Sequence, residues 1–129
     1  MYMEKELTIQ EIAKLTGLSV HTLRYYERIG LLDHVARTNS GYRKYSDADR
    51  AWIEFLNRLR ATGMTIRKMQ QFADLRRKGS ATIHERRVIL EEHQAEVRMR
   101  LLELQSNLES IEHKIVHYKE LEEDELATK

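Results

Sequence analysis

Residues 8–30 read TIQEIAKLTGLSVHTLRYYERIG and contain two short helical patterns separated by a turn. In the first pattern, Thr8 followed three residues later by Glu11 is typical of a helix N-terminus, and apolar residues then recur at helical spacing. Gly17 suits the positive φ of a tight corner, and Ser19 suits the N-cap of a second helix. The two expected helices span about residues 9–15 and 20–28. Two short helices joined by a glycine-containing turn predict a helix-turn-helix.

The segment from Leu31 to Tyr45 keeps no helical period. Its centre is a turn cluster, Thr38-Asn39-Ser40-Gly41, which lies between two short extended pieces, Val35 to Arg37 and Tyr42 to Lys44. This pattern predicts a β-hairpin, which beside a helix-turn-helix would form a wing.

Two further helices follow the wing. Ser46 with Asp49 marks the start of the first, which ends near Gly63, and Thr65 caps the second. Apolar residues on one face of each helix would close the core of an N-terminal head: Trp52, Phe55, Leu56, Leu59, Ile66, Met69, Phe72 and Leu75.

After a break at Lys78-Gly79-Ser80, one helical pattern continues to about Leu121 and carries a heptad repeat. The d positions are Leu90, Val97, Leu104, Ile111 and Tyr118, and the apolar a positions are Leu101, Leu108 and Ile115. Only Gln94 interrupts the apolar a series. Such a helix would be about 60 Å long and is typical of a coiled coil. It could instead pack on its own head, but a narrow apolar stripe is more easily buried by a second chain. We therefore predict dimerisation through Val97, Leu101, Leu104, Leu108, Ile111, Ile115 and Tyr118.

Charges beside the stripe bear on how the two chains run. In a parallel dimer, Lys114 would face Lys119, so no attraction results. An antiparallel register centred near Gln105 forms two attractive pairs, Arg98 with Glu112 and Glu91 with Lys119. Each exposed pair stabilises by only ~0.5 kcal/mol, but together they favour the antiparallel arrangement.

The composition limits the function classes. The 129 residues allow one compact domain or a small domain with an extension, and five Gly and no Pro favour a mainly α fold. Absence of cysteine excludes disulfides and thiolate metal or redox chemistry. No apolar run approaches the roughly 20 residues of a membrane helix, and residues 1–6 lack the apolar core of a signal peptide, so we expect a cytoplasmic protein without a membrane partner.

The net charge is +1, but its distribution is uneven. Residues 1–80 contain 15 Lys and Arg against 9 Asp and Glu, whereas residues 81–129 contain 7 against 12. The basic part is the candidate for nucleic acid, although solvated helix faces alone would give a similar division. We expect three parts: a head over 1–79, a dimerisation helix over 80–121 and a short acidic tail over 122–129.

The second predicted helix has the side chains that a recognition helix needs. Val20, His21 and Thr22 lie at its start, where they would reach base edges, and Arg24, Tyr25 and Arg28 lie where the DNA backbone would run. The wing adds Arg37, Tyr42, Arg43 and Lys44, and Arg60 would extend the same surface. Without a DNA-binding role, the arginines would be ordinary surface charges. One of Tyr25 and Tyr26 would be a core residue in either case, since neighbouring residues on a helix point about 100° apart and cannot both face the core.

Three runs make the resemblance specific: TIQEIA at 8–13, LRYYERIGLL at 23–32 and GYRKYS at 41–46. Over roughly residues 7–75 the chain resembles the MerR family of bacterial transcription regulators, and the long helix is similar to that family's antiparallel dimerisation coiled coil. The resemblance implies a homodimer that binds a pseudo-palindromic promoter site and distorts the DNA for RNA polymerase. It implies recognition-helix roles for Val20 and His21 and phosphate contacts from Arg24 and Tyr25, helped by Arg60. Arg43 matches the family's wing arginine. Family members that sense metals or oxidants use cysteines. Because this chain has none, the resemblance does not imply such sensing, and the effector stays unknown.

Other functions remain as alternatives. The coiled coil could be the functional part of an interaction protein, or the head could serve an architectural DNA-binding protein. The sequence contains no recognisable nucleophile–base pair and no glycine-rich phosphate-binding loop, so it does not predict an enzyme. His113 and His117 are four residues apart but lie at solvent-facing positions without a third ligand nearby, so we predict no metal and no cofactor.

Overall fold

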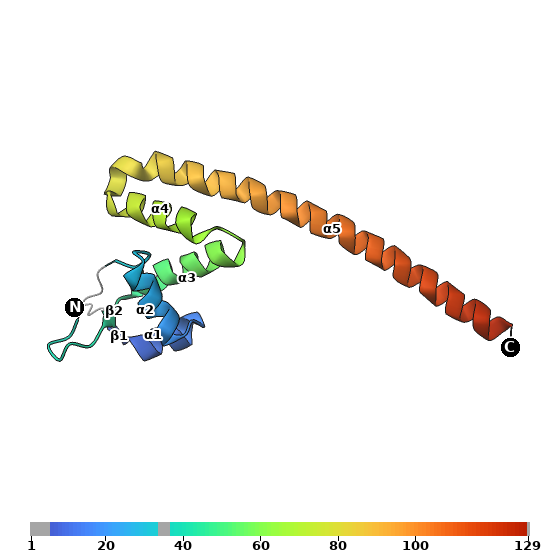
Figure 1. The fold of residues 1–129 in the computed structure, drawn as a ribbon, viewed down its shortest axis with the longest axis horizontal. Coiled ribbons are helices and arrows are strands. Elements are labelled where there is room, and N and C mark those ends of the chain that lie inside the picture. The colour runs from blue at the N-terminus through green and yellow to red at the C-terminus, as the bar shows by residue number, and fades with distance from the viewer. Residues whose placement is uncertain (1–5, 34–36, 129) are drawn as a thin grey trace. The chain divides into compact units, whose positions relative to one another are not determined.

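The computed structural model describes residues 6–33 and 37–128. The chain divides into two compact units, Met1–Leu90 and Glu91–Lys129, which we call the head and the arm. Their helices and strands are labelled in Figure 1. Helices account for most of the described residues, as the sequence predicted.

The first two helices form the predicted helix-turn-helix. Helix α1 spans Ile9–Thr16, and at its start the backbone N–H of Glu11 donates to the Thr8 hydroxyl over 3.1 Å. The helix ends at Gly17, whose φ of 76° is a left-handed conformation that glycine adopts without strain. Helix α2 spans Val20–Arg28 and is capped by the Ser19 hydroxyl.

The wing is confirmed in part and includes a strand that the sequence did not predict. Arg37 and Arg43 form an isolated antiparallel bridge around a turn that Gly41 closes. The next residues, β2 (Lys44–Tyr45), pair antiparallel with β1 (Leu7–Thr8) just before α1. A strand of two residues is too short to show the two-residue alternation of a β-strand, so the sequence pattern did not predict β1. The predicted extended residue Val35 lies outside the described residues.

Helices α3 (Asp47–Ala61) and α4 (Ile66–Arg77) begin at the predicted caps Ser46 and Thr65. A 3₁₀ turn, η1 (Gly79–Thr82), leads into α5 (Ile83–Ala127). Helix α5 continues beyond the expected end near residue 121, so residues 122–127 of the acidic segment are helical. No helix in the described part of the chain is long and apolar enough to cross a membrane.

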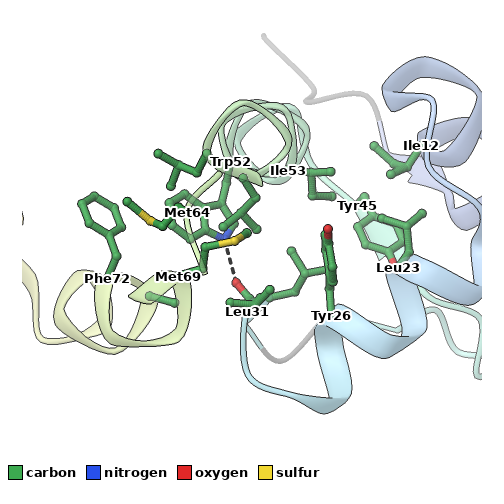
Figure 2. Close-up of a cluster of buried hydrophobic side chains, with 14 of the residues drawn as sticks. Ile12, Leu23, Tyr26, Leu31, Tyr45, Trp52, Ile53, Met64, Met69 and Phe72 are labelled. Atoms are coloured by element: carbon green, nitrogen blue, oxygen red, sulfur yellow. Dashed lines mark hydrogen bonds between the residues drawn. The ribbon is translucent and has the colours of Figure 1, made fainter. Parts of the chain in front are cut away.

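The head has one hydrophobic core to which both strands and every α-helix contribute. Figure 2 shows Ile12 of α1, Leu23 and Tyr26 of α2, and Tyr45 of β2 beside Ile53 of α3, all fully buried or nearly so. The core continues to α4 through Trp52, which stacks on Phe72 with ring centroids 5.9 Å apart. Helix α2 and the wing are therefore fixed to the same core.

Side chains of α3 and α4 also hold the segment Ile29–Asp33, which follows α2. Their bonds run from Gln70 to the carbonyl of Ile29, from Arg77 to that of Gly30, from Trp52 to that of Leu31, and from Arg76 and Arg77 to the carboxylate of Asp33. The bond from the indole Nε1 of Trp52 to Leu31 is 2.8 Å long and is drawn in Figure 2. We call this set of contacts the α3–α4 clamp. It fixes the chain between α2 and the wing.

The arm consists of α5 from Glu91 onward, and within one chain its apolar stripe is exposed to solvent. Leu104 at a d position is 65% exposed and Leu108 at an a position is 53% exposed. The other dimerisation candidates Leu101, Ile111, Ile115 and Tyr118 are exposed as well, and Val97 is half-buried. So much apolar surface on one helix indicates a partner.

Candidate nucleic-acid interface

Helix α2 presents polar and basic side chains on its outer face. His21, Arg24, Tyr25 and Arg28 are exposed, whereas Leu23 and Tyr26 on the opposite face are completely buried. This division follows from the 3.6-residue helical period. Four of the six side chains proposed on α2 are therefore available to a ligand.

Val20 and Thr22, the other two candidates on α2, are half-buried. Val20 packs against the core. Thr22 belongs to the helix cap, because its backbone N–H donates to the Ser19 hydroxyl over 3.0 Å and its own hydroxyl accepts from Ser19 over 2.9 Å. Their outer surfaces remain candidate contacts, but His21 is the most accessible side chain of the first turn.

The two adjacent tyrosines differ as predicted. Tyr26 is completely buried and Tyr25 is 36% exposed, with the guanidinium of Arg28 5.6 Å from its ring centroid. A cation over an aromatic ring restricts both side chains. Tyr25 and Arg28 thus form a pre-organised pair on the outer face.

Arg60 of α3 joins this surface through Tyr26. Its guanidinium donates to the Tyr26 hydroxyl over 2.8 Å, although Arg60 itself is exposed. This hydrogen bond raises the pKa of Arg60 above its ordinary value, so that its charge persists. A buried tyrosine therefore orients a surface cation.

The wing arginine Arg43 has a partner that sequence reasoning missed. Its Nε donates to a carboxylate oxygen of Glu27 in α2 over 2.5 Å, and the two side chains are only 23% and 16% exposed. A charge-assisted bond in a partly buried setting is stronger than a surface ion pair. No local pattern signals a pair 16 residues apart, and only the fold brings the two together.

The other wing cations are also held. Arg37 donates to the carbonyl of Gly41 over 3.0 Å, and Lys44 pairs with Glu6 over 3.0 Å. Tyr42 is 73% exposed at the hairpin. In contrast, the described residues provide no ion-pair partner for Arg24.

A hollow of about 540 Å³ opens between α2 and the wing. Its lining contains four arginines and two carboxylates among eight residues: Arg24, Glu27, Arg28, Gly30, Leu32, Asp33, Arg43 and Arg77. The excess of positive charge and the bidentate geometry of guanidinium suit a phosphate group. Arg77 was not among the candidates, because its position at the C-terminal end of α4 gave no sign that its side chain lies near α2.

Below this surface lies Tyr45, which is 1% exposed. Within the described residues its hydroxyl has no hydrogen-bond partner. Burial, reinforced by the negative charge of Glu27, raises the pKa of Tyr45 above its ordinary value. The residue acts as a packing element under the wing.

For metals, the described part of the chain contains no group of three or more His, Cys, Asp or Glu residues that would form a binding site. His113 and His117 are exposed on the arm.

Comparisons with known proteins agree with this geometry. The family model described as MerR family regulatory protein matches residues 8–45, and the model described as MerR, DNA binding matches residues 50–114. An HTH-type transcriptional regulator of Haemophilus influenzae is 34% identical over 86% of this chain and 82% of its own length. The regulator AdhR of Bacillus subtilis is 40% identical over 75% of this chain and 66% of its own length.

Solved structures are similar over most of both chains. A MerR family transcriptional regulator from Listeria monocytogenes has a TM-score of 0.83 and 34% identity, covering 88% of this chain and 86% of its own. HiNmlR, a MerR family regulator that lacks the sensor domain and was solved bound to promoter DNA, has a TM-score of 0.83 and 33% identity, covering 90% and 92%. A protein with a similar fold has therefore been solved in complex with promoter DNA.

Proposed function

This chain belongs to the MerR family of DNA-binding transcription regulators, and we propose that it binds a pseudo-palindromic promoter site as an antiparallel homodimer. Each head would read one half-site, with α2 in the major groove and the wing on the flanking backbone. As in the relative solved on promoter DNA, the ligand would be a duplex. The dimer would act on transcription by distorting the promoter for RNA polymerase.

One observation carries this proposal. The exposed face of α2, with His21, Arg24 and Arg28, lies beside the wing arginine Arg43, and three of these four residues line or border the same hollow. A helix that offers a short polar residue at its start and cations further along matches the division between base reading and phosphate binding. The cations would fix the position of α2, and His21 would contribute sequence preference.

The arm supports the dimer. Its exposed apolar stripe needs a partner, and the flanking charges favour an antiparallel second copy over a parallel one. Two identical heads related by a two-fold axis would require two inverted half-sites.

Salt-dependent DNA binding tests the assignment of roles. We expect Arg24→Ala and Arg43→Ala to weaken binding to specific and random duplexes alike and to reduce the salt slope by about one phosphate contact each. His21→Ala should instead change the preference at one base pair in each half-site. Fluorescence anisotropy against a set of single-base variants measures both effects. Identical sequence profiles for all three variants would overturn the proposed recognition helix.

A further inference from the structure

The arm contains two polar side chains in its otherwise apolar stripe. Gln94 occupies an a position and Tyr118 a d position, and both are exposed, Tyr118 by 60%. They lie 24 residues apart on the continuous helix α5, which corresponds to about 36 Å. They therefore cannot touch within one chain.

In an antiparallel coiled coil, each a residue faces a d residue of the partner. A register that places Leu108 opposite the partner's Leu104 pairs the remaining layers as Leu101 with the partner's Ile111, Ile115 with the partner's Val97, and Gln94 with the partner's Tyr118. Each apolar residue then faces an apolar one, and the polar residues face each other. We propose that the hydroxyl of Tyr118 donates to the side-chain amide oxygen of the partner's Gln94, and that the two resulting polar layers fix the register of the dimer. This inference rests on the antiparallel dimer proposed above.

Flanking charges support this register. The e positions form two attractive pairs, Arg98 with the partner's Glu112 and Glu91 with the partner's Lys119. On the other flank, Arg100 lies opposite the partner's Lys114, an unfavourable pair at an exposed edge where single charge pairs contribute little. The net electrostatic effect is attractive.

Neighbouring registers have less favourable charge pairs, and one of them also mismatches the polar layer. A shift by half a heptad in one direction places Glu91 opposite the partner's Glu112 and buries the amide of Gln94 against an isoleucine. The opposite shift places Arg98 against the partner's Lys119. A buried amide without a hydrogen bond is costly, and for that reason a single polar residue at an a position can specify a register.

The surface of the arm provides a matching depression. A hollow of about 450 Å³ is lined by Ile111, Lys114, Ile115, Tyr118, Lys119 and Glu122. The first four are successive d, g, a and d positions, which together form the hole that receives one knob from the facing helix. In the proposed register that knob is the partner's Val97.

Spin-label distances in the full-length protein test the register directly. Because the chain has no native cysteine, Met99→Cys and His113→Cys each introduce a single labelling site, at f positions outside the seam and seven residues from Ser106. In the proposed register the dimer is symmetric about the level of Ser106, so both label pairs are separated by about 21 Å along the helix axis. Double electron–electron resonance should therefore give equal distances for the two variants.

Other results have distinct meanings. A half-heptad shift would give axial separations of about 10 and 31 Å, and such unequal distances would overturn the register while leaving the dimer intact. If no distance between chains is detected and sedimentation shows a monomer, the dimer itself is wrong.

A double-mutant cycle tests the hydrogen bond. Gln94→Leu and Tyr118→Phe should be coupled in the dimer dissociation constant by about 25-fold, because the symmetric dimer contains two such hydrogen bonds and each contributes about fivefold. His117→Phe is the control, because its ring lies 6.1 Å from that of Tyr118 but occupies a c position, and it should combine additively with Gln94→Leu. Additive effects of Gln94→Leu and Tyr118→Phe would show that the two side chains do not meet.

Discussion

Glu27 is an acidic residue on a surface that we propose binds a polyanion. Its carboxylate lies 2.5 Å from the guanidinium of Arg43 and is mostly buried, so its main effect is to hold the wing arginine against α2. Tyr26 has the same relation to Arg60. Two of the proposed DNA-contacting cations thus depend on buried or half-buried partners for their position.

Replacing Glu27 shows whether this residue affects DNA binding by positioning Arg43 or only through its own negative charge. Glu27→Gln removes a negative charge near DNA, which by electrostatics alone would tighten binding. Because Arg43 loses its ion pair, we expect binding to weaken by about fivefold instead. Glu6→Gln, which removes the more exposed partner of Lys44, is the control and should bind as well as the unaltered chain or slightly better. Anisotropy titrations at one salt concentration compare the two; tighter binding by Glu27→Gln would contradict the positioning role.

The two fully buried tyrosines make a matched pair for stability. Tyr45→Phe removes a hydroxyl without a partner among the described residues and should stabilise the head by about 1 kcal/mol, whereas Tyr26→Phe removes the acceptor of Arg60 and should destabilise it by a similar amount. Urea denaturation at neutral pH measures both. Equal destabilisation by the two variants would show that the Tyr45 hydroxyl is satisfied in solution.

Alkaline pH provides an independent check on Tyr45. Burial raises the pKa of Tyr45, so this residue keeps its proton in the folded state after it has ionised in the unfolded state. The unfolded chain then binds fewer protons, and stability falls as pH rises above about 10, the ordinary tyrosine pKa. The advantage of Tyr45→Phe should therefore grow above that pH, as read from melting temperatures at pH 7 and pH 10.5. A constant difference would contradict the raised pKa.

Among the helices, capping and periodicity were sufficient to predict α1 to α4, because Thr8, Ser19, Ser46 and Thr65 all act as N-caps where expected. The exposed faces of α2 and of the arm also followed from periodicity. Contacts between distant segments did not. The β1–β2 pairing, the bond from Arg43 to Glu27 and the α3–α4 clamp depend on the closed fold, and no local spacing encodes them.

The contribution of the α3–α4 clamp to the free energy of unfolding can be measured at Trp52. This side chain donates to the carbonyl of Leu31 and supports the guanidinium of Arg76, which lies 4.2 Å from its ring centroid. Trp52→Phe leaves that carbonyl without its donor and removes packing, so we expect a loss of about 2 kcal/mol in the free energy of unfolding. Arg50→Ala on the same helix breaks only an exposed i,i+4 pair and should cost less than about 0.5 kcal/mol. Equal losses would contradict the clamp.

At the scale of the dimer, two leucines of the arm form a matched pair for testing the heptad assignment. Leu102 and Leu104 are both 65% exposed in the single chain, but Leu104 lies at a d position and Leu102 at a b position. Leu104→Glu should give monomers and lower DNA affinity by at least about tenfold, because two linked heads bind together whereas single heads bind separately. Leu102→Glu should remain dimeric. Sedimentation velocity compares them, and dissociation by both variants alike would contradict the heptad assignment.

The central claim is that two copies of this chain recognise two inverted half-sites in promoter DNA. Selection of bound duplexes from a random library by the purified protein, followed by measurement of the stoichiometry on the selected sequence, tests it most directly. We predict an inverted repeat with fixed spacing, bound by two chains per duplex, and loss of the selected preference in His21→Ala. No enrichment over the starting library, or a single half-site bound by one chain, would contradict the account.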